Sequence, residues 1–387
     1  MKAARASGPA TLSNHQGGAR LERLDWPPGR LALAAGDAVY VRPLRLSRLG
    51  DAEPDGGFLP LAGGPLAFAA VDLVIRRAGR FGIATASLAD LRLWMASDGA
   101  AMAGTIGAHL ARLSAQRPPF AGLALDLPVI MGVINVTPDS FSDGGQFFDP
   151  RSAIAQGFAL AEAGARILDI GGESTRPGAA PVSEQEELDR VLPVIEGLRG
   201  AGAVLSVDTR HARVAKAALA AGASILNDVT ALADPDSAAV ARAAGAAVVL
   251  MHMQGEPRTM QKAPSYAFAP VDVFDALAGR AGAAEAAGLP GHGIAVDPGI
   301  GFGKTPAHNV EILAWLGLLH ALGRPLVIGV SRKSFIAAIS RGEPASRRLA
   351  GSLAATLAAL EQGAQIIRVH DVAETVQAVT VWQRIRG

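Results

Sequence analysis

Two sets of polar side chains in this sequence follow short apolar runs and differ in the chemistry they offer. The first set contains short planar groups, namely Asp208, Asn227 and Asp297. Their carboxylate and amide oxygens accept hydrogen bonds and the asparagine amide also donates, which suits the edge of a flat heterocycle bearing amide and amino groups. Such a site rejects rings without those groups, because its buried polar atoms would be left unpaired. These residues predict a site for a planar polar ring.

The second set is cationic and contains Arg176, Lys333, Arg368 and His370. Arg368 and His370 are two positions apart, so on a strand both point to the same side. Together they suit a phosphate or diphosphate group. Lys333 stands directly before Ser334, which is expected to open a helix, and this arrangement is typical of an anion site.

Asn135 precedes a long polar segment, "VTPDSFSDGG". Long polar loops on a rigid scaffold often cover binding sites. A neutral amide oxygen also suits a magnesium ion that keeps most of its waters and is otherwise held by substrate phosphates. We therefore expect Asn135 to contribute to a Mg²⁺ site beneath a mobile loop.

The elements that must position these residues follow a repeated pattern, in which an alanine-rich helix end and a glycine precede a β-branched run. Clear copies lie at 162–170, 220–228, 243–251 and 361–369, with a looser copy at 199–208. Further apolar runs lie at 127–136, 293–297 and 324–330. Eight continuous apolar strands separated by helices indicate a parallel sheet covered on both faces.

The predicted fold class is α/β, a (β/α)8 TIM barrel over residues 127–387 with a small N-terminal α/β accessory domain. The length of this region matches the size of such a barrel, about 250 residues. The polar residues fall just after the strands, at the end where the active sites of these barrels lie. An open doubly wound sheet is the alternative.

The residues before the barrel are expected to form three segments. Residues 1–22 are small and polar and predict a disordered tail. Residues 23–118 predict the accessory domain, with a helical segment that begins at a Ser87 cap, and residues 119–126 predict a linker. Nothing in the accessory domain suggests a reaction.

Composition excludes several classes of function. The chain of 387 residues has no cysteine, which excludes disulfides, thiolate metal sites and a cysteine nucleophile. A net charge of +1 predicts neither nucleic acid nor a membrane surface as partner. The N-terminus lacks the apolar region of a secretory signal, and the apolar stretches fall short of the roughly 20 residues of a membrane span. We therefore expect a cytoplasmic protein.

Two motifs are better explained without a ligand. "PGIGFGKT" at 298–305 resembles a P-loop, but Pro298 stands where the first glycine is needed, so a nucleotide site is not expected. His252, between Met251 and Met253, is interpreted as a hydrogen-bonded barrel residue rather than a ligand.

Other polar residues leave their roles open. Asn227 and Asp228 are adjacent on one strand, so only one can face the barrel opening while the other is expected to make structural hydrogen bonds. Glu173 either supports a neighbouring site residue or braces Arg176. Arg332 is interpreted as lying outside the barrel.

Several motifs together resemble the dihydropteroate synthases of the folate pathway. In chain order these are "MGVINVTPDSFSDGG", "ILDIGGESTRPGA", "SVDT", "NDV", "DPGIGFGK", "GVSRKSF" and "RVHDV". The first two are long and highly specific. The resemblance extends over residues 127–387, about two thirds of the chain, and does not include the N-terminal region.

The resemblance implies a reaction in which 4-aminobenzoate displaces diphosphate from 6-hydroxymethyl-7,8-dihydropterin diphosphate to give 7,8-dihydropteroate. It also implies the residues that bind the pterin: Asp208, Asn227, Asp297 and Lys333. The residues implied for the diphosphate are Arg368, His370 and Asn135, the last also on Mg²⁺. Those implied for the aminobenzoate pocket are Thr175, Arg176, Pro177, Phe302 and Ser334.

Catalysis in this family would be electrostatic, and Asp208, Lys333 and Arg368 are the residues expected to carry it. The diphosphate would leave early, and Asp208 would stabilise the resulting pterin cation before the aniline nitrogen attacks. Closed loops would exclude water. A homodimer is possible, and sulfonamides are expected to compete with 4-aminobenzoate.

Two other functions remain as alternatives. A methyltetrahydrofolate-corrinoid methyltransferase shares the barrel and the pterin pocket, but would have no reason for the Arg368 and His370 pair. A catalytically silent homologue would bind pterin for regulation while its N-terminal domain recruits a partner.

Overall fold

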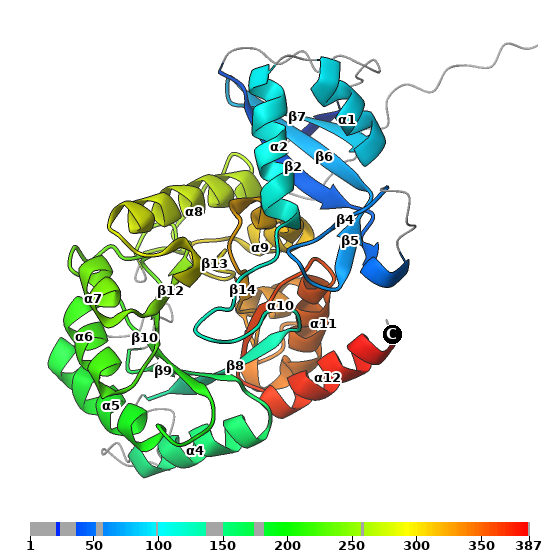
Figure 1. Ribbon diagram of the computed structural model, residues 1–387. Helices are drawn as coiled ribbons and strands as arrows, with labels where there is room; N and C mark the ends of the chain where they lie inside the picture. The colour runs from blue at the N-terminus through cyan, green and yellow to red at the C-terminus, as the bar shows by residue number, and fades with distance from the viewer. Residues whose placement is uncertain are drawn as a thin grey trace, which may run out of the picture.

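The computed structural model describes residues 21–23, 36–51, 57–97, 100–136, 150–173, 182–256 and 259–385. Figure 1 shows a barrel with a smaller α/β domain against one side of it. The predicted loops after Asn135 and after Glu173 lie outside the described residues.

The barrel contains all eight predicted strands. They are β8 (Val129–Asn135), β9 (Ile167–Gly171), β10 (Val204–Asp208), β11 (Ile225–Asp228), β12 (Ala247–Met251), β13 (Ile294–Asp297), β14 (Val327–Ile328) and β15 (Ile366–Val369). All pairings are parallel, in the order β13-β12-β11-β10-β9-β8-β15-β14. A parallel bridge between Val296 and Leu326 joins the two ends. The sheet is therefore closed into the predicted barrel, and the open doubly wound alternative is excluded.

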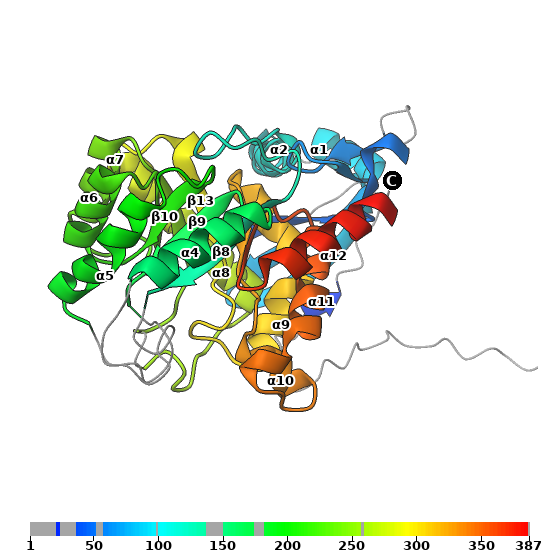
Figure 2. The same ribbon diagram turned by 90° about the horizontal axis from the view of Figure 1, so that it is seen from below.

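Helices cover the outside of the barrel (Figures 1 and 2). The α-helices are α4 (Pro150–Glu162), α5 (Glu184–Gly197), α6 (Ala212–Ala221), α7 (Ser237–Ala244), α8 (Ala269–Ala286), α9 (Pro306–Ala314), α10 (Ser334–Ile339), α11 (Leu349–Leu360) and α12 (Val372–Ile385). The 3-10 helices are η2 (Gly291–Gly293), η3 (Leu316–Leu322) and η4 (Ala345–Arg347). The strands alternate: in β9, Leu168 and Ile170 belong to the outer core under the helices, and Ile167 belongs to the inner one.

The predicted linker has a second role that its sequence did not reveal. Phe120 and Leu123 form a small antiparallel bridge, and Phe120 and Leu125 are buried. Both pack inside the barrel against the first inward residues of the strands, among them Ile167 and Ile366. Residues 119–126 thus form an apolar floor at the N-terminal ends of the strands as well as joining the two domains.

The described part of the accessory domain contains two small sheets, two α-helices and one short 3-10 helix. Its elements are β1 (Leu21–Arg23), β2 (Ala38–Leu44), β3 (Ser47–Arg48), η1 (Leu49–Asp51), β4 (Leu59–Pro60), β5 (Leu66–Phe68), β6 (Ala70–Arg77), β7 (Arg80–Ser87), α1 (Leu88–Ser97) and α2 (Ala100–Ser114). The larger sheet has the order β1-β7-β6-β2 and the smaller β3-β5-β4. Ser87 caps the helical segment, since its Oγ accepts from the Asp90 N–H at 3.0 Å.

The boundary of the predicted tail needs correction. Leu21 and Glu22, assigned to the tail, form part of β1 and pair with Phe81 and Gly82 of β7. Residues 1–20 lie outside the described residues.

The accessory domain is tied to the barrel by polar contacts. The Tyr40 hydroxyl and the Arg76 guanidinium both bind the Asp275 carboxylate of α8, at 3.0 and 2.6 Å. The buried Arg117 donates from Nη2 to the His320 carbonyl of η3 at 2.9 Å. Because these contacts join side chains to the outer helices of the barrel, the two domains form one packed unit.

Within the described residues, no helix is both long and apolar enough to cross a membrane.

Candidate active site

A buried carboxylate, Asp169, lies at the centre of the polar interior. It is the second inward residue of β9 and is fully buried. It accepts hydrogen bonds from Arg368 Nε at 2.6 Å, Ser206 Oγ at 2.6 Å and Asn227 Nδ2 at 3.1 Å. Asp169 therefore connects strands β9, β10, β11 and β15.

The sequence did not predict Asp169 as a site residue, because Asp169 stands inside its apolar run and not just past it. The available signal was a charged residue inside the otherwise apolar run "RILDIGG". A carboxylate in a buried strand has to be paired, so it predicts a cationic partner across the barrel.

Arg368 bridges Asp169 to Asp208. Its Nη2 lies 2.6 Å from Asp208 Oδ2, and Nη1 has no hydrogen bond to any described residue. Burial acts to lower the pKa of Arg368, but the Asp169 and Asp208 carboxylates outweigh it and raise that pKa above its ordinary value. Burial raises the pKa of Asp208, while Arg368 opposes the rise. The geometry modifies the sequence prediction for Arg368, because two of its nitrogens are engaged by protein and Nη1 remains for a ligand.

The strand register brings three predicted residues to the same height of the barrel rim. Asn135 pairs with Gly171, Gly171 with Asp208, and Asp208 with Asn227. Asn135 is half-buried, and its side chain has no hydrogen bond to a described residue. Asn227 faces the barrel interior, where its side-chain amide donates a hydrogen bond to Asp169.

Of the neighbouring residues Asn227 and Asp228, Asp228 is the one that makes structural hydrogen bonds. Its carboxylate accepts from the Thr230 N–H at 2.7 Å and the Leu232 N–H at 3.0 Å. It is fully buried and fixes the turn after β11.

Lys333 and Phe302 form a second part of the rim. The Lys333 ammonium lies 4.2 Å from the centroid of the Phe302 ring. Burial lowers the pKa of Lys333 to about 8, and the nearby Arg368 adds to the shift. Asp297, at the end of β13, accepts from the Gly299 N–H at 2.7 Å, and burial raises its pKa. Lys333 is thus a partly desolvated cation beside an aromatic face.

The loop that carries Phe302 is held by a buried lysine. The ammonium of Lys304 donates to the carbonyls of His252, Gly299 and Phe302 at 3.2, 2.9 and 2.9 Å, and lies 3.0 Å from His252 Nδ1. Burial lowers the pKa of Lys304 to about 7. Because this side chain is only 2% exposed, it is not available to a phosphate, in agreement with the argument against a P-loop.

Close packing in this loop also requires glycine. Gly299 has φ +65°, and a Cβ there would lie 1.9 Å from the His252 carbonyl oxygen. His252 is itself hydrogen-bonded and buried in part, and burial lowers its pKa to about 3. It is a structural residue of the loop, the role that the sequence analysis favours.

His370 lies close to Arg368 and Lys333 and bonds to a neighbouring hydroxyl. Its Nδ1 lies 3.1 Å from Ser331 Oγ. Burial lowers the pKa of His370 to about 4, and Arg368, Arg332 and Lys333 add to the shift. Burial thus disfavours the charged form of His370, and its role at the diphosphate stays a prediction.

Two of the three remaining polar residues, Glu173 and Arg332, have clear partners. Glu173 binds Arg210 through two hydrogen bonds, at 2.9 and 3.0 Å. Arg332 is exposed and forms an ion pair with Asp371, outside the barrel. Ser334 is exposed at the start of α10.

Thr175, Arg176 and Pro177, predicted for the aminobenzoate pocket, lie outside the described residues, so their predicted roles stay predictions.

This closed barrel, with carboxylates, an amide and cations converging on one rim, is the arrangement of a barrel enzyme that binds a polar ring and an anion. The family described as pterin binding enzyme matches residues 131–370. The chain belongs to this family.

Several similar proteins are named dihydropteroate synthase. That of Escherichia coli (strain K12) is 46% identical over 263 residues, 67% of this chain and 93% of that protein. A structure of the Xanthomonas albilineans enzyme with 4-aminobenzoic acid has a TM-score of 0.66 and 49% identity, and covers 69% of this chain and 97% of that one. A structure of the same species' enzyme with 7,8-dihydropteroate has a TM-score of 0.63 and 46% identity, over 68% and 96%.

Proposed function

We propose that this protein is a dihydropteroate synthase. It joins 6-hydroxymethyl-7,8-dihydropterin diphosphate to 4-aminobenzoate and releases diphosphate. The observation that carries the proposal is the convergence of Asp208, Asn227, Asp297 and Lys333 on the rim of a closed barrel. The complexes of the Xanthomonas albilineans enzyme with 4-aminobenzoic acid and with 7,8-dihydropteroate support it.

In this proposal the pterin ring lies among the planar groups. Asn227 and Asp297 hydrogen-bond its amide and amino edge, and Lys333 donates to it. The fixed geometry of Asn227 supports this role, since its amide is already oriented by Asp169 at 3.1 Å. A pre-oriented donor and acceptor set binds a ring without the cost of ordering it first.

The diphosphate leaves toward the cations. Arg368 Nη1 has no partner among the described residues and can donate to a departing phosphate oxygen. His370 is held through Nδ1 by Ser331, which leaves Nε2 to donate in one tautomer. Charge on the leaving group is thereby stabilised by donors that are in place before the reaction.

Asp208 stabilises the positive charge that develops on the pterin as the bond to diphosphate breaks. Its ion pair with Arg368, at 2.6 Å, places the carboxylate at the same rim as the anion-binding nitrogen. The aniline nitrogen of 4-aminobenzoate then attacks the pterin methylene carbon and loses a proton. Phe302 and Ser334, with Thr175, Arg176 and Pro177, form the aminobenzoate pocket in this proposal.

A magnesium ion is part of the proposal, with Asn135 as its protein ligand. No group of three or more acidic or histidine side chains in the described part of the chain could hold a metal alone. One amide oxygen at the rim fits an ion that is otherwise bound by water and phosphate oxygens. Bound there, Mg²⁺ would neutralise charge on the diphosphate.

The test is a diphosphate-release assay on the purified protein with Mg²⁺. Diphosphate should appear only when both the pterin diphosphate and 4-aminobenzoate are present, with 7,8-dihydropteroate as the second product, and a sulfonamide should compete with 4-aminobenzoate. Pterin binding without any product would instead favour the catalytically silent homologue. Methyl transfer from methyltetrahydrofolate to a corrinoid would favour the other alternative.

The homodimer and the cytoplasmic location stay predictions, which sedimentation and cell fractionation can test.

A further inference from the structure

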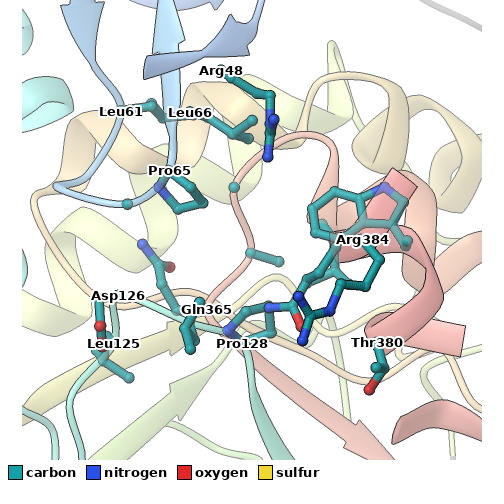
Figure 3. Close-up of a pocket in the computed structure, with 17 residues that line it drawn as sticks. Arg48, Leu61, Pro65, Leu66, Leu125, Asp126, Pro128, Gln365, Thr380 and Arg384 are labelled. Carbon is teal, nitrogen blue, oxygen red and sulfur yellow. The ribbon is translucent and has the colours of Figure 1, made fainter. Parts of the chain in front are cut away.

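A cavity of about 380 Å³ lies between the accessory domain and the barrel. Pro128 and Gln365 line it, and they stand directly before strands β8 and β15. The cavity, shown in Figure 3, is therefore at the N-terminal ends of the strands. The rim that carries Asp208 and Asn227 is at the opposite, C-terminal ends. It is separate from the site of the proposed reaction.

Apolar side chains from both domains form most of the walls. The accessory domain contributes Leu61 and Leu66, the floor segment Leu125, and the barrel region Leu127 and Leu360. Leu127 is 59% exposed. The volume falls within the range of small-molecule pockets, about 300–1,000 Å³. These walls suit the apolar body of a small molecule.

The walls are fixed by the packing around them. The side-chain oxygen of Gln365 accepts from the Leu326 N–H at 2.9 Å, and the backbone carbonyl of Gln365 accepts from the Val129 N–H at 2.8 Å. On the other side, the Leu61 N–H donates to the Leu66 carbonyl at 2.7 Å. The cavity is thus bounded by hydrogen-bonded backbone on both domains rather than by loose loops.

Two arginines reach this cavity from different domains, Arg48 from β3 and Arg384 from α12 (Figure 3). Neither side chain has a hydrogen bond or ion pair with any residue in the described part of the chain, and the same holds for the exposed Asp126 in the lining. The ionised groups of the lining therefore carry a net charge of +1. An arginine without a partner beside an apolar cavity is suited to a carboxylate.

We propose that this cavity is a second binding site, which takes a small carboxylate with an apolar body, such as an aromatic or medium-chain acid. The carboxylate binds Arg48 and Arg384, and the body packs on the leucines. Because the ligand contacts both domains, it stabilises their association. The proposal does not depend on the reaction at the other end of the barrel.

The first experiment compares naphthalene-2-carboxylate with its uncharged amide by isothermal titration calorimetry on the full chain. A charge-assisted hydrogen bond predicts that the carboxylate binds about tenfold more tightly than the amide. It should also raise the thermal unfolding midpoint. Octanoate tests an aliphatic body. If neither acid binds at millimolar concentration, or if amide and carboxylate bind equally, the proposal is wrong.

Variants locate the site. Arg48→Gln and Arg384→Gln should each weaken binding of the carboxylate about tenfold, and Asp126→Asn should tighten it about twofold by removing a like charge. Arg280→Gln, at an exposed position on α8, is the matched control and should leave affinity unchanged. Arg384 is also exposed, so its substitution leaves the fold intact even if that of Arg48 does not.

A competition experiment separates this site from the active site. The carboxylate should bind with the same affinity when 7,8-dihydropteroate is saturating. Displacement by 7,8-dihydropteroate, or full binding to Arg384→Gln, would overturn the proposal. These measurements need no turnover, so an inactive protein would still give a clear result.

Discussion

The two ends of the barrel are built from the same strands but have opposite interiors. At the N-terminal ends, inward residues such as Ile167 and Ile366 pack on Phe120 of the floor. Two positions further along the same strands stand Asp169 and Arg368, which form an ion pair at 2.6 Å. Burying charges costs free energy even when they are paired. Stability and chemistry are therefore divided along each strand. The apolar packing at the N-terminal end offsets the free-energy cost of burying charges nearer the C-terminal end.

The largest effect on turnover is expected from Arg368→Ala. It removes a donor to the leaving group and leaves the Asp169 and Asp208 carboxylates without their cation. We expect turnover to fall about 10³-fold and the free energy of unfolding to fall by about 3–5 kcal/mol. Diphosphate release and urea denaturation measure the two. Arg166→Ala, at an exposed position directly before β9, is the control and should change neither.

Asp169→Asn tests the residue at the centre of the polar interior. The substitution keeps the shape of the side chain but removes its negative charge. The carboxylate that is lost orients Arg368 and accepts a hydrogen bond from Asn227. Turnover is expected to fall about 10²-fold, since misplaced donors stabilise the transition state poorly. Steady-state kinetics compare it with Glu162→Gln, an exposed substitution. Unchanged kinetics would show that Arg368 does not need Asp169 to hold its guanidinium in place.

Lys304→Met should have a smaller effect on the chemistry. It leaves the carbonyls of Gly299 and Phe302 without their donor, so the loop that positions Phe302 beside Lys333 is expected to move. The kcat/KM for the pterin diphosphate should fall about tenfold. A lower unfolding midpoint with unchanged kcat/KM would mean that the lysine only supports the fold.

The pH profile tests the charge of Lys333. Its pKa of about 8 means that the cation is present below that pH and is lost above it. The kcat/KM, which reports the free enzyme, should therefore fall above pH 8, by nearly tenfold per unit. In Lys333→Arg the side chain stays charged, so this limb should disappear. An unchanged limb in that variant would assign it to another group.

Phe120→Ala should change turnover least, although it affects stability strongly. It opens a cavity in the floor, and the free energy of unfolding should fall by about 3–5 kcal/mol. The kcat should remain within about twofold of the parent if the ends act independently. Chemical denaturation and steady-state kinetics on the same sample decide this. A kcat that falls as far as that of Arg368→Ala would contradict the division between the two ends.

The sequence predicted most of the barrel because its strands are buried on both faces. Their continuous apolar runs, most of them after a glycine, are visible without any partner, and the polar residues after them mark one rim. Asp169 was missed because its role depends on Arg368, 199 residues away in the sequence. The lowered pKa of His370 and the burial of Phe120 likewise depend on neighbours that only the folded chain supplies.

The floor formed by Phe120 and Leu125 gives the barrel the shape of a cup with a single opening. In the proposed reaction, two substrates and two products then share one route between solvent and site. Diphosphate and dihydropteroate have to leave before the next pterin diphosphate can enter, so traffic through the opening can limit the cycle as much as bond making does.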